Sequence, residues 1–155
     1  MPDDTGTCPE EKDSSGEHGV VEDTELLARI VLRKMVGKDL VLTREAIKTD
    51  EFFKKNGWSF VRESFADMKV LLAERANSKG RNLSDHGYAL VKTSDIRSML
   101  DAEQKRQVCV IDDPQPGFAA HALGQKSRPL EEEDAREIRD DLLELFEKVH
   151  YPWKP

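Results

Sequence analysis

Three segments of the chain carry the pattern of a β-strand. They are WSFVRES at 58–64, YALVK at 88–92 and QVCVID at 107–112. In the first, Trp58, Phe60 and Arg62 alternate with their neighbours, and this period of two is typical of a strand. The third is rich in β-branched residues, which favour strands. AAHALGQ at 119–125 follows a Pro-rich turn, and we expect it to pair with the third segment as a hairpin across a wide turn.

A spacing of three and four between apolar residues predicts helices around these strands. The first runs from Glu25 to Val36, with Leu27, Ile30 and Val31 on one face and Gly37 as a left-handed stop. The other predicted helices are a short one after Thr49, one from a Ser64 cap to about residue 79, a short one capped by Ser94 and a long one from Leu130 to His150.

The order of these elements predicts an α+β domain with a small mixed or antiparallel sheet covered by helices. A two-layer sandwich is the expected arrangement. Residues 38–48 leave two readings open, a short strand with a turn or a second helical piece. At 155 residues the chain is expected to hold one domain, over residues 22–155.

Residues 1–24 hold the whole formal net charge of -7, because they contain eight acids and one base while the remaining 23 acids and 23 bases balance. Such an acidic segment with Gly, Ser and Pro buries too little apolar surface to offset its ordering entropy. We therefore expect residues 1–21 to form a disordered acidic tail. A neutral body with an acidic tail also argues against nucleic acid as a partner, since phosphate binding needs a surplus of Lys and Arg.

The two cysteines are Cys8, in the predicted tail, and Cys109, inside an apolar segment. Because one is expected to be mobile and the other buried, no structural disulfide is expected. The chain opens with acids instead of a signal-peptide pattern, and no apolar run approaches the length of a membrane span. These features predict a cytoplasmic protein without a membrane partner.

The hairpin at 108–125 is the first candidate for chemistry, since a wide turn could bring Asp113 close to His121. A carboxylate that orients an imidazole is the minimal general-base pair. The alternative reading is structural: Asp113 caps the turn, and His121 satisfies a backbone group in a half-buried strand. Asp112, Asp113 and Glu63 could also offer oxygen ligands to magnesium.

Arg62, which precedes Glu63 and Ser64, is the second candidate. A guanidinium beside a helix N-terminus favours an anion. With His86 or His121 it could form an RNA-cleaving or NAD-using pocket, although an arginine at a strand end more often reaches solvent. The sequence lacks the recognised motifs of nucleotide hydrolases, zinc enzymes and serine hydrolases, so no metal or cofactor is expected.

Aromatic residues close the chain, where Tyr151 and Trp153 flank Pro152. Tyrosine and tryptophan are enriched at protein interfaces, so these two are candidates for contact with a partner, while Trp153 could instead fold back onto its own domain. The leading hypothesis is a non-catalytic accessory or adaptor protein that binds another protein. The alternative is a small enzyme, a nuclease or transferase, that acts on a phosphate-containing substrate with Arg62 as anion clamp and His121 as base beside Asp113.

Four segments, WSFVRES, HGYALVKTSDIRSM, VCVIDDPQP and AAHALG, occur in an order that resembles a group of small bacterial proteins. These share a Ser-x-x-Arg strand, a Gly-x-Ala-x-Val strand leading to an Ile-Arg helix, then Asp-Pro and Ala-His-Ala. The resemblance covers about Trp58 to Gly124, and this chain departs from it at Phe60 and by a longer loop at 81–86. It implies an α+β domain of bacterial origin from an antiviral-defence (CRISPR-type) gene neighbourhood. It implies no reaction and no catalytic residues.

Overall fold

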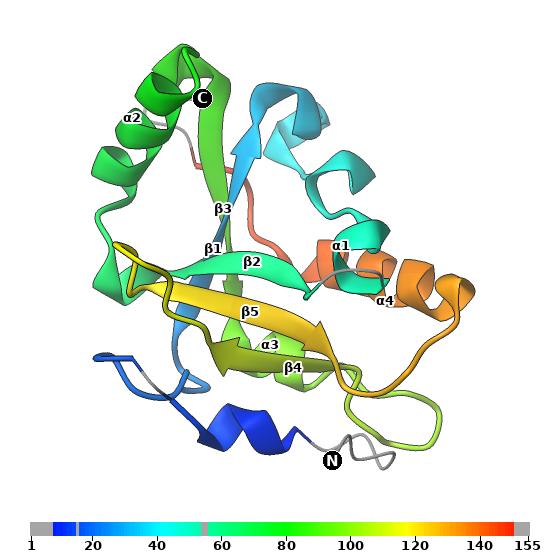
Figure 1. Cartoon of the computed structure of the whole chain (residues 1–155). Coiled ribbons are helices and arrows are strands. Elements are labelled where there is room, and N and C mark those ends of the chain that lie inside the picture. Colours follow the sequence, from blue (N-terminus) through cyan, green and yellow to red (C-terminus); the bar gives the residue numbers. More distant parts are fainter. Residues whose placement is uncertain (1–7, 15, 54–55, 151–155) are drawn as a thin grey trace.

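The computed structural model describes residues 8–14, 16–53 and 56–150, which form an α+β fold (Figure 1). The strands are β1 (Leu26–Leu32), β2 (Trp58–Arg62), β3 (His86–Lys92), β4 (Val108–Asp112) and β5 (His121–Lys126). The helices are α1 (Thr49–Phe53), α2 (Met68–Ser78), α3 (Thr93–Arg97) and α4 (Glu132–Leu145). The strands form one antiparallel sheet in the order β3-β1-β2-β5-β4. The predicted fold class is therefore confirmed.

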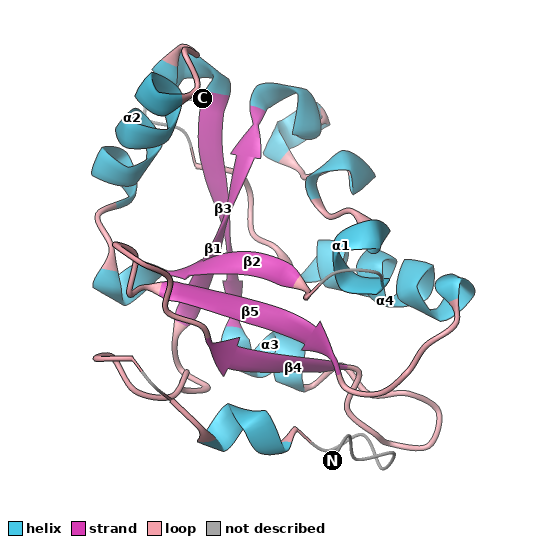
Figure 2. Ribbon diagram, viewed as in Figure 1, coloured by secondary structure: helices cyan, strands magenta, loops and turns pink. Residues whose placement is uncertain are grey.

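Helices lie on both faces of the sheet, as Figure 2 shows. On one face, Leu27 and Phe60 from the strands belong to the same buried cluster as Phe52 of α1, Ile96 of α3 and Ile138 of α4. On the opposite face a smaller cluster joins residues of the strands to α2, and its buried members are Ala28, Val61, Met68, Leu90 and Ala120. The expected two-layer sandwich is therefore wrong, because the strands bury side chains on both faces.

The first predicted helix is also wrong, since residues 26–32 form strand β1. β1 pairs with β3 along its whole length, from Leu26 opposite Lys92 to Leu32 opposite His86. Leu27 is buried on one face of the sheet and its neighbour Ala28 on the other. A strand covered on both faces is apolar along most of its length, as β1 is apart from Arg29, and its pattern cannot be told from that of a buried helix.

The three predicted strands and the hairpin partner of the third are confirmed, and β4 pairs with β5 across the Pro-rich turn. The ambiguous segment 38–48 contains two 3-10 turns, Lys38–Leu40 and Arg44–Ala46. The helix expected from Ser64 begins later, at Met68, because Asp67 is its cap and accepts hydrogen bonds from the backbone N–H groups of Lys69 and Val70.

The last helix, α4, is shorter than expected because the chain after Leu145 turns along the outer edge of β3. The backbone N–H of His150 donates to the carbonyl of Tyr88 over 2.7 Å, and the N–H of Tyr88 donates back to His150 over 2.9 Å. The N–H of Glu147 donates to the carbonyl of Leu90. These bonds satisfy edge groups of β3 that would otherwise be open to pairing with another chain.

The N-terminal segment lies along the opposite edge of the sheet, beside β4 (Figure 1). Cys8 is joined to Cys109 of β4 by a disulfide, and a 3-10 turn, η1 (Pro9–Lys12), follows. Val21 is 2% exposed and belongs to the main core. The expectation of no structural disulfide is therefore wrong.

The predicted boundary of the acidic tail at residue 21 is corrected by the same contacts. The described part of that stretch, residues 8–14 and 16–21, lies against the sheet, because Glu11 pairs with Arg97 and Arg106 and the carbonyl of Gly19 accepts from Arg62. Residues 1–7 and 15 lie outside the described residues, and disorder there stays a prediction. Among the described residues, no helix combines the length and the apolar character that crossing a membrane requires.

Candidate anion-binding site

The sheet splits between β1 and β2, and this split creates a partly enclosed hollow. The two strands pair at only two positions, Leu27 with Arg62 and Ala28 with Val61. Beyond them β1 and β3 run at a steep angle to β2, β5 and β4 (Figure 1). The backbone of β2 near Ser59 therefore has no strand on this side to pair with.

The side chain of Arg29 lies between β1 and β2 at the point where the two strands separate. Its guanidinium donates to the backbone carbonyl of Ser59 over 3.0 Å and to that of Ala46 over 3.1 Å, and it forms an ion pair with Glu51 at 2.8 Å. Three planar donors fixed in one fork suit this task, because they satisfy carbonyls that lie in different directions. Arg29 thus replaces the missing strand-to-strand hydrogen bonds and brings a positive charge to the split.

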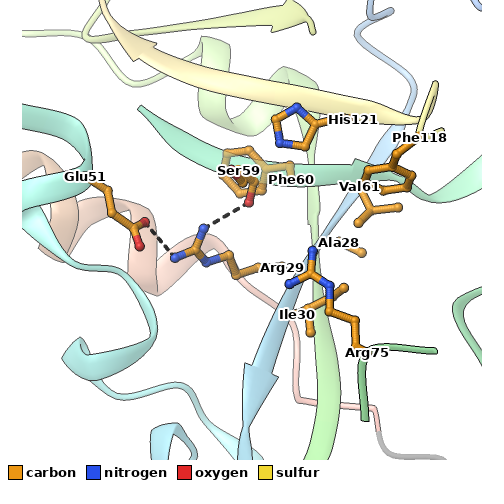
Figure 3. A pocket seen from close by; sticks show the side chains of 10 residues that line it. All are labelled: Ala28, Arg29, Ile30, Glu51, Ser59, Phe60, Val61, Arg75, Phe118 and His121. Carbon is orange, nitrogen blue, oxygen red and sulfur yellow. Dashed lines mark hydrogen bonds and ion pairs between the residues drawn. The ribbon is translucent and has the colours of Figure 1, made fainter. Parts of the chain in front are cut away.

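The hollow has a volume of about 260 Å³ and opens on the face of the sheet that α2 partly covers. Figure 3 shows its lining side chains, which come from β1, β2, β5, α1, α2 and the turn before β5. They are Ala28, Arg29, Ile30, Glu51, Ser59, Phe60, Val61, Arg75, Phe118 and His121. We call this hollow the split cleft. Its size suits a single charged group or a small molecule rather than a large cofactor.

His121 enters the split cleft from β5 with its ring held on one side. Its Nδ1 lies 2.9 Å from the backbone carbonyl oxygen of Asp113 and 3.1 Å from that residue's carboxylate Oδ2. Both partners are acceptors, so Nδ1 carries the proton when the ring is neutral, and the lone pair is then on Nε2. Nε2 has no hydrogen-bond partner in the described part of the chain. The other edge of the imidazole is therefore available to a ligand.

Arg75 reaches the same cleft from the exposed face of α2 (Figure 3). No acidic side chain pairs with its guanidinium among the described residues, whereas Arg29 is neutralised by Glu51. The cleft therefore holds one uncompensated cation beside a second, paired guanidinium and an imidazole. Such groups recognise carboxylate and phosphate, and the guanidinium does so with two parallel hydrogen bonds.

Arg62 lies apart from these residues, on the opposite face of the sheet. Its side chain is fully buried, and its guanidinium pairs with both oxygens of Glu25 at 2.8 Å and with Asp112 at 2.9 Å. It also donates to the backbone carbonyls of Gly19 and Val20. The structure therefore brings Asp113 and His121 together but holds Arg62 away from them. With all its donors used inside the protein, Arg62 neither reaches solvent nor clamps an external anion.

The pKa of the Glu25 carboxyl shows how the buried cluster favours its charged form. Burial alone would raise its pKa, but the hydrogen bonds and charge of Arg62 outweigh that effect and leave the pKa lowered. For Arg62, burial acts against the charged form, while Glu25 and Asp112 raise the pKa of the guanidinium. Glu25 and Arg62 therefore stay charged at neutral pH, and the cluster is a structural tie between the N-terminal segment and the sheet.

The other candidates from the sequence lie elsewhere. Asp112 is occupied by Arg62 and by the hydroxyl of Ser14, so it is not free to join Asp113 and Glu63 as a metal ligand. Within the described ranges, no three His, Cys, Asp or Glu side chains lie close enough to hold a metal ion. His86 is buried at the start of β3, where its Nδ1 lies 3.2 Å from the carbonyl oxygen of Asn82.

Tyr151 and Trp153, the predicted contact residues, lie outside the described residues. Comparison with known proteins adds no relationship: no family model, no curated protein and no solved structure matches the chain. The resemblance to small bacterial proteins therefore stays a prediction.

Sequence reasoning missed Arg29 and Arg75 as members of the site. Arg29 lies in the segment predicted to be a helix, and Arg75 is one of several charged residues on an exposed helix face. No local signal marks either one, because their shared position depends on where β1 separates from β2.

Proposed function

We propose that this protein is a non-catalytic binding module that takes an acidic group of a partner protein into the split cleft. The observation that carries the proposal is the guanidinium of Arg75, which has no acidic partner among the described residues and shares the cleft with Arg29 and His121. A side-chain carboxylate supplies the acidic partner that Arg75 lacks among the described residues. A carboxylate also fits a hollow of about 260 Å³.

Binding is favoured over catalysis because the cleft offers no group for His121 to activate. A histidine oriented by an aspartate needs a nucleophile within hydrogen-bond reach of its free nitrogen. Ser59 also lines the cleft, yet its hydroxyl forms no hydrogen bond with His121 in the described structure. His121 can instead serve as a fixed contact, since a protonated ring donates from Nε2 to an anion.

A second candidate is a small enzyme that acts on a phosphate-containing substrate, with His121 as base and Asp113 as its orienting acid. The geometry of this pair, 3.1 Å between Nδ1 and Oδ2, favours it. Arg62 has no part in this version, since its guanidinium is buried in its own cluster. Arg75 would take its place as the anion clamp, and a water molecule would have to serve as the nucleophile.

The cellular setting of the proposal rests on the sequence. The cytoplasm is the proposed location, and the resemblance described above favours a bacterial accessory protein of an antiviral-defence (CRISPR-type) system. Tyr151 and Trp153 remain candidates for a further contact with the partner protein, in addition to the contact in the cleft.

The test is a titration of ¹⁵N-labelled protein with a hexaglutamate peptide, followed through the backbone amide signals of Ser59 and His121. Loss of a charge-assisted hydrogen bond costs about 1.5–3 kcal/mol, so Arg75→Gln should weaken binding roughly 10- to 100-fold. Arg136→Gln is the matched control, because Arg136 is exposed on α4, on the opposite face, and pairs with Glu132. That variant should bind as the wild type does.

Two further arms separate the candidates. Inorganic phosphate replaces the peptide in the first, and hydrolysis of p-nitrophenyl phosphate is measured in the second. Phosphate binding through Arg75 without peptide binding would reject the protein partner in favour of a small ligand. Turnover that disappears in His121→Ala would establish the enzyme instead. If neither probe shifts the signals of Ser59 and His121, the split cleft is not an anion site.

A further inference from the structure

β4 is an edge strand, and its outward backbone groups form hydrogen bonds with side chains rather than with another strand. The N–H of Val110 donates to the carboxylate of Glu11 over 2.7 Å, and the carbonyl of Val110 accepts from Arg97 over 2.9 Å. The carbonyl of Val108 accepts from Arg106 over 3.3 Å. An open edge of this kind, VCVID in sequence, would be a ready template for pairing.

Residues 8–13, which we call the β4 cover, lie along this edge and supply the acceptor for the N–H of Val110. One oxygen of Glu11 accepts from the backbone of Val110 and from both Arg97 and Arg106, at 3.0 and 2.5 Å. Cys8 ties the segment to β4 through its bond to Cys109. A single carboxylate and a single covalent bond thus hold the cover on the strand.

Apolar packing contributes little to the β4 cover. Its 3-10 turn, Pro9–Lys12, buries none of its residues. The rest of the N-terminal segment differs sharply, since Val21 lies in the core and Glu25 pairs with buried Arg62. Segments with few buried apolar contacts open at low free-energy cost, so the cover can leave while the segment behind it stays in place.

We propose that the Cys8–Cys109 bond is a redox latch, and that opening it uncovers β4 as a docking edge for an extended acidic segment of a partner. A cellular dithiol supplies two electrons and two protons. The Sγ–Sγ bond breaks, both cysteines become thiols, and the dithiol is oxidised to a disulfide. In the cytoplasm proposed above, a disulfide of this kind is a reversible contact rather than a permanent one.

The chemistry of the uncovered edge selects its occupant. When Glu11 leaves, Arg97 and Arg106 lose the carboxylate that they share, Arg97 keeps only its pairing with Asp23, and the outward N–H of Val110 becomes free. A strand added to an edge binds through its main chain, and charge decides which strand is accepted. Two copies of β4 would bring like-charged arginines together. An extended partner segment with glutamates would instead supply a carboxylate to Arg97 and Arg106, as Glu11 does in the closed state.

The first measurement is hydrogen exchange at the Val110 amide in the full chain, oxidised and after treatment with a dithiol. We expect exchange to become about tenfold faster or more on reduction, and equally fast in Cys8→Ser, while the amide of Leu27 in the core keeps its protection. Glu11→Gln should show part of this effect in the oxidised protein. Glu10→Gln is its matched control, since Glu10 is an exposed neighbour.

The second measurement adds a peptide of alternating valine and glutamate, with an alternating valine and lysine peptide as control. Both are tested in the Arg75→Gln background, so that binding in the split cleft does not contribute. The acidic peptide should bind to the reduced protein and to Cys8→Ser but not to the oxidised protein, and its binding should shift the signal of Val110. Equal binding of the lysine peptide would reject the proposed partner.

Other outcomes overturn the latch itself. Unchanged exchange at Val110 after reduction would show that the cover stays in place without the bond. Dimerisation of the reduced protein would show that the edge takes a second copy instead. Global unfolding of both the reduced protein and Cys8→Ser would make the bond a structural requirement. These results are independent of the split cleft, which lies between β1 and β2.

Discussion

Arg62→Met tests whether one buried guanidinium ties the N-terminal segment to the sheet. Methionine keeps the apolar stem but removes every donor. The carboxylates of Glu25 and Asp112 then lose their cation, and the backbone carbonyls of Gly19 and Val20 lose a donor. Those groups stay buried, because Val21 continues to hold the segment in the core.

The expected cost follows from the burial of both sides of the ion pair. The Arg62 side chain is 1% exposed, and those of Glu25 and Asp112 are 10% and 0% exposed. Removing one partner of a pair so thoroughly buried costs about 3–5 kcal/mol. For a chain of this length each kcal/mol corresponds to about 2–4 °C, so the melting temperature should fall by roughly 6–20 °C.

Urea unfolding followed by the fluorescence of buried Trp58 and by circular dichroism measures the loss. Arg44→Met is the matched control, because the side chain of Arg44 is 72% exposed and its pairing with Asp140 at 3.2 Å should contribute little. Adding Glu25→Gln and Asp112→Asn to Arg62→Met should recover part of the stability, since the unpaired charges are then gone. A cost below about 1 kcal/mol for Arg62→Met, no larger than that of Arg44→Met, would refute the structural tie.

The remaining predictions concern pH and helix capping. Because the folded-state pKa of Glu25 is lowered, its contribution is complete above the unfolded value of about 4.3 and is lost as the pH falls through the folded value. The difference in unfolding free energy between wild type and Arg62→Met should therefore be smaller at pH 3 than at pH 7, and an equal difference at both pH values would contradict the assignment. Asp67→Ala should cost about 0.5–2 kcal/mol, since it removes the cap of α2, while Ser64→Ala should change stability by less than about 0.5 kcal/mol. Urea midpoints of the two variants decide this, and the reverse ranking would mean that the helix begins at Ser64.

The local pattern was a reliable guide where one segment alone determines the structure. The alternation of Trp58, Phe60 and Arg62 predicted β2, and the β-branched run before Asp112 predicted β4 and its hairpin. The short helix after Thr49 was also predicted correctly. In each case the signal spans fewer than about ten residues, and backbone geometry translates that spacing directly into an element.

Asp113 and His121 are the part of the candidate site that the sequence predicted. They lie eight positions apart on the two arms of one hairpin, so the antiparallel pairing of β4 and β5 is enough to bring them together. The structural reading of His121 was partly correct as well, since its ring also contacts the backbone carbonyl of Asp113. Arg62 was expected beside them, yet β2 turns its side chain to the other face.

The sequence by itself determined the α+β class, β2 to β5 and the His121–Asp113 pair, because the contacts behind them are local or lie within one hairpin. Only the tertiary structure decided that residues 26–32 form a strand, since that depends on α2 and α4 covering opposite faces. It also decided the Cys8–Cys109 bond, whose partners lie 101 positions apart, and the split cleft, which exists because β1 and β2 pair at two positions and then diverge. Contacts over such separations depend on how whole elements pack, and no spacing along the chain encodes that.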